Sequence, residues 1–196
     1  MSVFAALYDP VLWLTEASFL SAARSALLAD LRGRVLEIGA GTGLNLPHYP
    51  PGITLVLTEP SAGMRARLAA RTSAEVASCG AEALPFPDAS FDEAVSTLVL
   101  CSVRDPDRAL SEIRRVLAPG GRLRFLEHVA SDHPLTGPVQ RALDPLWAPL
   151  AGGCHLCRDT VGAIGRAGFT LEAVEPAWPW SVPPFLRPFV RGTAIR

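Results

Sequence analysis

The sequence predicts a single α/β domain built on a mostly parallel β-sheet. Three observations support this prediction. Strand and helix patterns alternate along most of the chain, several strand candidates are almost uninterruptedly apolar, and the first strand runs directly into closely spaced glycines. Repeated strand–helix units favour a parallel sheet with right-handed crossovers, and strands buried on both faces need apolar side chains along their whole length. The length of 196 residues fits one domain.

Composition excludes several other protein classes. Apolar residues make up 49% of the chain and charged residues 19%, as in globular proteins. The formal net charge of -1, without any basic run, argues against a nucleic-acid partner. No stretch approaches the ~20 apolar residues that span a bilayer, and the N-terminus lacks the pattern of a signal peptide. We therefore expect a cytoplasmic protein, with peripheral membrane contact at most.

The first elements are expected within the first 80 residues. Leucines and alanines at helical spacing predict an amphipathic helix over 11–31. A short apolar strand at 34–38 enters the glycines, and a second strand at 54–58 ends at an acidic residue followed by proline. A helix is expected at 64–71 and a short strand at 75–79.

The middle of the chain carries the clearest patterns. After the turn-rich segment 84–88, residues 91–100 are rich in strand formers and almost wholly apolar, which predicts a buried parallel strand. Residues 107–117 place their apolar side chains on one helical face. The Pro-Gly-Gly sequence at 119–121 stops this helix before the next strand, at 122–129.

The last third is less regular. A helical region interrupted by prolines is expected over about 135–150, and a helix closed by a glycine over 158–167. A strand follows at 170–175. The stretch 176–189 is rich in proline and tryptophan and cannot be a regular helix or a central strand. It is either an apolar lid or rim, or a packed loop, and it precedes a final strand at 190–195.

The turn after the first strand carries the strongest functional signal. Gly39, Gly41 and Gly43 follow at alternate positions, and glycine lets a backbone approach a ligand without a Cβ in the way. A dinucleotide fingerprint needs a glycine where this chain has Leu44. Glu37, two positions before the first glycine, would repel a pyrophosphate but not a cationic sulfonium cofactor. The charge therefore favours S-adenosylmethionine (SAM) over a nicotinamide dinucleotide.

A second acidic residue stands where a ribose would be bound. Glu59 comes twenty residues after Gly39, at the end of the second strand. Ligands of open α/β sheets bind at the carboxyl ends of the strands, and a carboxylate at this place can accept both ribose hydroxyls.

Together these residues resemble the class I SAM-dependent methyltransferases that contain a methyltransferase type 11 domain. The similarity rests on several motifs spread between residues 35 and 129. They are the glycine turn 35–43, the acidic Glu59, the segment Gly80–Phe86, Phe91-Asp92 with its strand, and the helix-to-strand turn Arg115–Gly121.

The resemblance implies a Rossmann-like, mostly parallel seven-stranded sheet with an antiparallel last strand and helices on both faces. It implies an N-terminal helical cap over 1–33, a SAM-binding domain over 34–196, SAM as cofactor with S-adenosylhomocysteine as product, and no metal. In many relatives an aspartate stands where this chain has Gly80, and it can accept a hydrogen bond from the adenine amino group. In this chain that contact would be made by the backbone or by Glu82, or it would be lost. The residues assigned to the cofactor are Tyr8, Glu37, Gly39, Ala40, Gly41, Gly43, Asn45, Glu59, Pro60, Met64, Gly80, Ala81, Glu82 and Leu98.

Further motifs resemble the branch that includes the animal membrane-associated alkyl-thiol S-methyltransferases. They are Leu98–Val103, Glu127–Val129, Asp144-Pro145-x-Trp147 and the segment Gly153–Thr160. The resemblance implies a small apolar acceptor, including an alkyl thiol. A thiol with a pKa of about 8.5 is already partly ionised near neutrality, so no strong base is obligatory. His128, at the end of its strand, is the candidate catalytic helper; the alternative is a structural histidine bonded to the backbone.

Other readings stay open. The acceptor could be a phenol or a quinone-like compound methylated on oxygen or carbon, or the protein could bind SAM without turnover. Asp144 and Arg158 could shape the acceptor site or be ordinary helix-start and surface residues. Cys154 and Cys157 look like half of a zinc or redox motif. Without a second such pair, we expect reduced thiols near a turn at a helix start.

Overall fold

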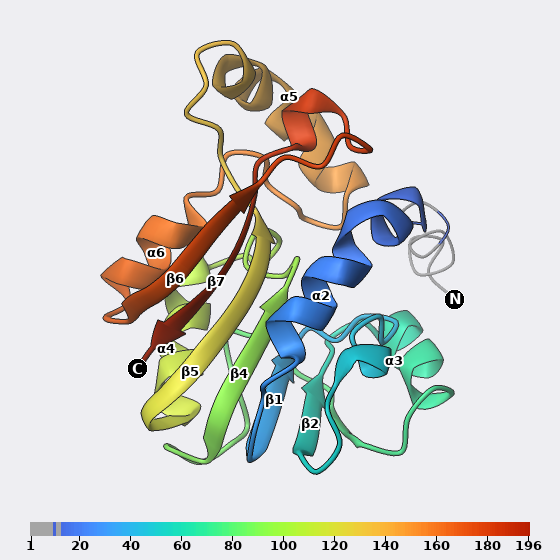
Figure 1. Ribbon diagram of the computed structural model, residues 1–196, viewed down its shortest axis with the longest axis vertical. Helices are drawn as coiled ribbons and strands as arrows, with labels where there is room; N and C mark the ends of the chain where they lie inside the picture. The colour runs from blue at the N-terminus through green and yellow to red at the C-terminus, as the bar shows by residue number, and fades with distance from the viewer. Residues whose placement is uncertain (1–9, 11–12) are drawn as a thin grey trace.

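The computed structural model describes residues 10 and 13–196, and in them one seven-stranded sheet forms the centre of the molecule (Figure 1). The strand order is β3-β2-β1-β4-β5-β7-β6. Neighbouring strands from β3 to β5 run parallel, whereas β7 runs antiparallel to both β5 and β6. The predicted mostly parallel sheet with an antiparallel last strand is confirmed. The strands are β1 (Arg34–Ile38), β2 (Thr54–Thr58), β3 (Glu75–Ala77), β4 (Phe91–Thr97), β5 (Leu117–His128), β6 (Thr170–Ala177) and β7 (Phe189–Ile195).

Helices cover both faces of this sheet. Helix α2 lies across one face, and α4 and α6 lie on the other (Figure 1). The helical elements are η1 (Glu16–Leu20), α2 (Ser21–Leu28), η2 (Leu46–His48), α3 (Ala62–Ala69), α4 (Pro106–Val116), α5 (Thr136–Leu150), α6 (Thr160–Arg166) and η3 (Pro184–Leu186).

The alternation of side chains along the central strands explains the two layers. Val35 and Val95 belong to the buried cluster under α2, whereas Leu36 and Ala94 belong to the cluster under α4 and α6. Successive side chains of a strand point to opposite faces, so a strand covered on both sides must be apolar at both sets of positions. This is why the central strands read as continuous apolar runs. Helices η1 and α2 complete one of the two cores with Leu20, whose side chain is fully buried.

Capping side chains set several helix starts. The Asp105 carboxylate accepts a hydrogen bond from Arg108 N at 3.0 Å, with Pro106 in the first turn of α4. Ser61 caps α3, which therefore begins at Ala62, two residues before the predicted start. A side-chain oxygen at this position satisfies an amide that has no partner within the helix.

Some predicted boundaries are wrong. Strand β4 ends at Thr97 and not at residue 100, because Leu98 has a φ of +59° and turns the chain out of the sheet. Strand β3 ends at Ala77, before Cys79. Strand β5 begins at Leu117, before the Pro-Gly-Gly sequence that was expected to separate it from α4.

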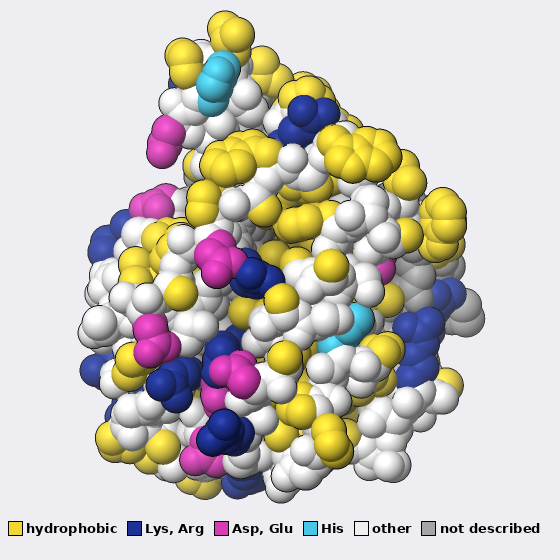
Figure 2. Space-filling view, in the orientation of Figure 1, with side chains coloured by type: hydrophobic (Ala, Val, Ile, Leu, Met, Phe, Trp, Pro, Cys, Tyr) yellow, Lys and Arg dark blue, Asp and Glu magenta, His cyan; other side chains and the backbone are white. Residues whose placement is uncertain are grey.

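Helix α5 and the segment around η3 form a cap beyond the carboxyl end of β5 (Figure 1). Gln140 of α5 ties the cap together, because its side chain accepts from Ser131 N at 2.7 Å and donates to the Phe185 carbonyl at 3.0 Å. Figure 2 shows hydrophobic side chains gathered over this part of the molecule. Trp178 and Trp180 are 64% and 76% exposed there. Within the described residues, no helix has the length and apolar character needed to cross a membrane.

Candidate active site

The three glycines after β1 lie at the carboxyl edge of the sheet, and each has a positive φ. A Cβ at Gly39 would come within 2.8 Å of Val99, and one at Gly43 within 2.7 Å of Leu46. A Cβ at Gly41 would meet nothing closer than 4.0 Å. Side chains at Gly39 and Gly43 would therefore collide with their neighbours, whereas the space above the Gly41 backbone is open to a ligand. Gly43 also lines a surface pocket with Leu44, Leu46, Pro47 and Arg71.

Glu59 lies directly beside this turn. One carboxylate oxygen accepts from Gly41 N at 2.9 Å, and the other accepts from Ser61 N at 2.7 Å. The side chain is buried but has reached the carboxyl edge of the sheet, as the sequence predicts. Each carboxylate oxygen retains lone pairs for a further donor. Next to Glu59, Pro60 is exposed, and Met64 of α3 is buried.

Glu37 lies in a buried polar network behind the glycine turn. Its oxygens accept from Asn45 Nδ2 and from the Tyr49 hydroxyl, both at 2.8 Å. Burial raises the pKa of the Glu37 carboxyl, although these two hydrogen bonds and the charge of Arg24 oppose that shift. Arg24 donates to Asn45 Oδ1 at 2.7 Å and to Thr97 Oγ1 at 3.0 Å. Glu37 and Asn45 thus connect the turn to α2 and β4.

Sequence reasoning missed three members of this network, namely Arg24, Tyr49 and Thr97. Arg24 lies within the helix predicted over 11–31 and is only 3% exposed. The sequence does contain a signal for this burial. Arg24 precedes Leu27 and Leu28 by three and four positions, so a helix places it on the same face as these two leucines. Tyr8, which the sequence assigns to the cofactor, lies outside the described residues.

The segment after β3 contains three further residues that the sequence assigns to the cofactor, namely Gly80, Ala81 and Glu82. Ala81 is buried, and Glu82 Oε1 accepts from Arg104 N at 3.0 Å. The Glu82 Oε2 atom lies 3.0 Å from the position of a Cβ at Gly80. The carboxylate of Glu82 therefore lies close to the backbone of Gly80.

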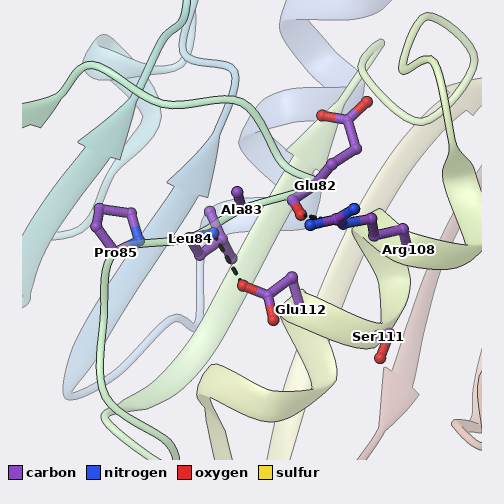
Figure 3. A pocket seen from close by; sticks show the side chains of 7 residues that line it. All are labelled: Glu82, Ala83, Leu84, Pro85, Arg108, Ser111 and Glu112. Carbon is purple, nitrogen blue, oxygen red and sulfur yellow. Dashed lines mark hydrogen bonds between the residues drawn. The ribbon is translucent and has the colours of Figure 1, made fainter.

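A surface pocket lies between this segment and α4, lined by Glu82–Pro85, Arg108, Ser111 and Glu112 (Figure 3). Leu84 N donates to Glu112 Oε2 and Arg108 Nε donates to the Glu82 carbonyl, both at 2.9 Å. These bonds join the 80–85 segment to α4. The polar groups of this pocket thus hold the 80–85 segment in place.

The turn after β4 is organised by a buried glutamate. Glu127 of β5 accepts from Ser96 Oγ at 2.7 Å, from Val99 N at 3.1 Å and from Cys101 N at 3.3 Å. These bonds hold the segment that begins at Leu98, whose positive φ is sparsely populated for a residue with a side chain. Glu127 thereby shapes the backbone that the sequence places beside the cofactor.

His128 occupies the end of β5, under the cap. Its side chain is 3% exposed, and its ring packs edge-to-face on Phe189 with the centroids 5.8 Å apart. Neither ring nitrogen makes a hydrogen bond of normal geometry with a described residue, and the same holds for the buried Trp147 Nε1. The alternative of a histidine bonded to the backbone is not observed. Buried polar atoms without partners are rare in native proteins.

The loop between α5 and α6 brings Cys154 to this position. Asp144 of α5 accepts from Leu156 N and contacts His155 Nδ1 at 3.0 Å, which fixes the loop. Arg158 donates to the Val103 carbonyl at 2.8 Å and ties the loop to the segment after β4. The predicted helix-start position of the two cysteines is wrong by a few residues, because α6 begins only at Thr160. Asp144 and Arg158 therefore hold the loop between α5 and α6 in place.

The residues present fit a nucleoside cofactor that carries a sulfonium. Gly41 borders open space beside the Glu59 carboxylate, and Gly80 and Glu82 stand at the end of the neighbouring β3. The acidic side chains suit a cationic ligand with ribose hydroxyls. Among the described residues, no three histidine, cysteine or acidic side chains gather in a way that could hold a metal ion.

Comparison with known proteins agrees with this geometry. Residues 36–125 match the family model described as a methyltransferase domain. The chain is 35% identical over 188 residues to the thiol S-methyltransferase TMT1B of Rattus norvegicus, covering 86% of this chain and 75% of that protein. It is 33% identical over 174 residues to a phosphatidylethanolamine N-methyltransferase of Cereibacter sphaeroides, with 84% of each chain covered.

The fold is also that of solved structures. A SAM-dependent methyltransferase from Thermotoga maritima superposes with a TM-score of 0.75 at 24% identity, covering 98% of this chain and 96% of that one.

Proposed function

The chain belongs to the class I SAM-dependent methyltransferases, and from this premise we propose that it methylates the sulfur of a small apolar thiol. The cofactor is SAM, and the product derived from it is S-adenosylhomocysteine. The observation that carries the proposal is the buried His128 at the end of β5, whose ring nitrogens make no hydrogen bond of normal geometry with a described residue, although the Cys154 thiol interacts with the ring.

The surroundings of His128 favour an apolar acceptor. Its ring contacts Phe189, and Trp147 of the cap packs edge-to-face on Phe185 with the centroids 5.9 Å apart. Aromatic side chains provide large apolar contacts. A small apolar thiol that packs against these rings would offer its proton to an imidazole nitrogen. The likeness to the rat thiol S-methyltransferase supports the same acceptor class.

Bound SAM supplies a methyl group on a cationic sulfur, whose transfer to an anionic thiolate consumes both charges and is favoured where water is excluded. The chain's own residues position the reactants. We propose that Gly41 leaves room for the cofactor, that Glu59 accepts its ribose hydroxyls, and that Glu127 holds the backbone after β4 in place. A ring nitrogen of His128 takes the proton of the acceptor thiol, and the cap excludes water. Alignment of the reacting atoms supplies much of the remaining rate.

The test is a panel of acceptors incubated with SAM while S-adenosylhomocysteine is measured. Alkyl thiols should give the highest kcat/KM, and phenols, a quinone precursor and an amine of similar size should give at least tenfold less. A phenol or quinone precursor as the best acceptor would replace S-methylation by O- or C-methylation. An amine as the best acceptor would replace it by N-methylation. Absence of S-adenosylhomocysteine with every acceptor, despite measurable SAM binding, would contradict the thiol proposal.

We also propose peripheral contact of the cap with a membrane interface. Leu146 and Leu150 of α5 are 70% and 79% exposed, and both tryptophans of the 178–180 segment lie at the surface. Tryptophan is enriched at membrane–water interfaces. Sedimentation with neutral vesicles should recover a small fraction of the wild-type protein and less of a Trp178→Ser/Trp180→Ser variant. Equal recovery of the two proteins would contradict this contact.

A further inference from the structure

Cys101 and Cys154 come together in space although 53 positions separate them in the sequence (154 − 101). Cys101 follows β4, and Cys154 lies in the loop between α5 and α6. Their side chains interact directly. Two backbone contacts hold the segments together around the pair. His155 N donates to the Cys101 carbonyl at 2.9 Å, and a Cβ at Gly153 would lie 2.9 Å from the Ser102 carbonyl oxygen.

The two thiols differ in environment. Cys101 is 1% exposed, whereas Cys154 is partly accessible to solvent. The pKa of the Cys154 thiol is lowered to about 5, chiefly by its interaction with Cys101. Burial opposes this shift, whereas His128 and Trp147 lower the pKa of Cys154 further. The same contact and burial raise the pKa of Cys101 well above its usual range. One partner is thus a reachable thiolate at neutral pH and the other a buried thiol.

The other two cysteines provide contrast. Cys79 and Cys157 are also partly accessible, but burial raises the pKa of both thiols. Reactive cysteines combine partial exposure with a lowered pKa, whereas structural ones do not. Of the four cysteines in the chain, only Cys154 meets both conditions and has a second thiol beside it.

We propose that Cys154 and Cys101 form a redox site, in which a hydroperoxide oxidises Cys154 and Cys101 converts the product into an intramolecular disulfide. In the first step the Cys154 sulfur attacks the peroxide, a sulfur–oxygen bond forms, the oxygen–oxygen bond breaks, and the leaving oxygen is protonated to an alcohol or to water. In the second step the Cys101 sulfur displaces hydroxide from the sulfenic acid, and the Cys101 proton converts that hydroxide to water. Two thiols are oxidised by two electrons, and one hydroperoxide is reduced.

The inference does not depend on the identity of the methyl acceptor, because it concerns thiols of the protein itself. The test is treatment of the reduced full-length protein with hydrogen peroxide at pH 6 and pH 8, alkylation of the remaining thiols, and peptide mass spectrometry. We expect one cross-linked pair of peptides, containing Cys101 and Cys154, which dithiothreitol separates. At pH 6 Cys154 should react about tenfold faster than Cys157, after allowance for the lower nucleophilicity of a low-pKa thiolate. Its rate should change little between the two pH values, while that of Cys157 rises.

Variants separate the two steps. In Cys101→Ser, dimedone should trap a sulfenic acid at Cys154 that does not accumulate in the wild type. In the matched control Cys157→Ser, the cross-link between Cys101 and Cys154 should form as in the wild type. Oxidation of Cys79 or Cys157 as fast as Cys154 at pH 6, or oxidation of Cys154 in the wild type without a link to Cys101, would overturn the proposal. Both of these results can be read from the wild-type protein even if a variant folds poorly.

Discussion

The two halves of the sheet's carboxyl edge differ in how their polar groups are satisfied. Beside β1 and β2, both Glu59 oxygens and both Glu37 oxygens accept hydrogen bonds from the protein. Beside β5, the ring nitrogens of His128 and Trp147 Nε1 are buried without a partner of normal geometry among the described residues. A buried polar group left unpaired costs about 1–3 kcal/mol. The polar groups beside β1 and β2 are thus satisfied by the protein, whereas those beside β5 face the Cys154 thiol without a hydrogen bond of normal geometry. We name these regions the cofactor half and the acceptor half, after the roles proposed above.

The largest effect should come from filling the space at the cofactor half. Gly41→Val would place a branched side chain into the opening beside Glu59, and we expect SAM affinity, measured by calorimetry, to fall at least about a hundredfold. Gly52→Val is the matched control, because Gly52 also has a positive φ and open surroundings but lies in the exposed turn before β2. Both variants should lose roughly 1–2 kcal/mol of unfolding free energy from the left-handed conformation. Equal SAM affinity of the two variants would show that Gly41 does not border the cofactor.

Removing the carboxylate of Glu59 should have the next largest effect. Glu59→Ala deletes the proposed acceptor of two ribose hydroxyls and the hydrogen-bond partner of Gly41 N and Ser61 N. A hydrogen bond to a charged group contributes about 1.5–3 kcal/mol, so we expect SAM affinity to fall by about tenfold to a hundredfold. Glu59→Gln keeps one acceptor oxygen and should lose less. The exposed Glu75 of β3 gives a control, Glu75→Gln, that should bind as the wild type does. Unchanged affinity of Glu59→Ala would remove Glu59 from the cofactor site.

The two halves also differ in how much of their structure could be predicted from the sequence. Strands β1 and β2 have the predicted bounds, because each is a short apolar run whose end is marked by glycines or by Glu-Pro. The end of β4 could not be predicted, since the left-handed Leu98 depends on the Glu127 bonds to the following amides. Local spacing likewise indicates the glycine turn and Glu59.

The acceptor half is assembled from distant segments, and no local pattern describes it. Cys101, His128, Trp147 and Cys154 come from the segment after β4, the end of β5, α5 and the following loop. Only the sheet order and the packing of the cap bring these side chains together. A sequence pattern could single out His128 as a candidate, but it could not reveal that its ring nitrogens lack partners.

A smaller effect, confined to part of the pH range, is expected for His128→Ala. If a ring nitrogen takes the proton of the acceptor thiol, turnover at saturating SAM should fall roughly ten- to a hundredfold at pH 7, toward the low end of general-base effects. Near pH 9 a thiol with a pKa of about 8.5 is largely ionised, so most of the deficit should disappear. The exposed His133 provides the control variant His133→Ala, which should follow the wild-type pH–rate profile. A deficit that is the same at every pH would leave catalysis to alignment alone.

The smallest effect concerns stability at the acceptor half and rests on Cys154. Its pKa of about 5 in the folded protein lies below the roughly 8.5 of an unfolded cysteine. Between these values the unfolded chain binds the proton and the folded chain does not, so the stabilisation is complete above pH 8.5 and is lost as the pH falls to 5. The groups that face this thiol are Cys101, His128 and Trp147, with Glu127 beside Cys101. Of the two thiols in this cluster, only Cys154 has a lowered pKa. A stability that increases with pH in this range therefore identifies Cys154 as the titrating thiol.

We therefore expect the difference in unfolding free energy between the wild type and Cys154→Ala to increase with pH, by at most ~1.4 kcal/mol per pH unit. Denaturant titrations between pH 5 and pH 8.5 measure it. Cys157→Ala is the control, because burial raises the pKa of Cys157 and the corresponding difference should not increase over this range. A flat difference for Cys154→Ala would mean that its thiol stays protonated near neutral pH. The contrast between the two halves would then rest on His128 and Trp147 alone.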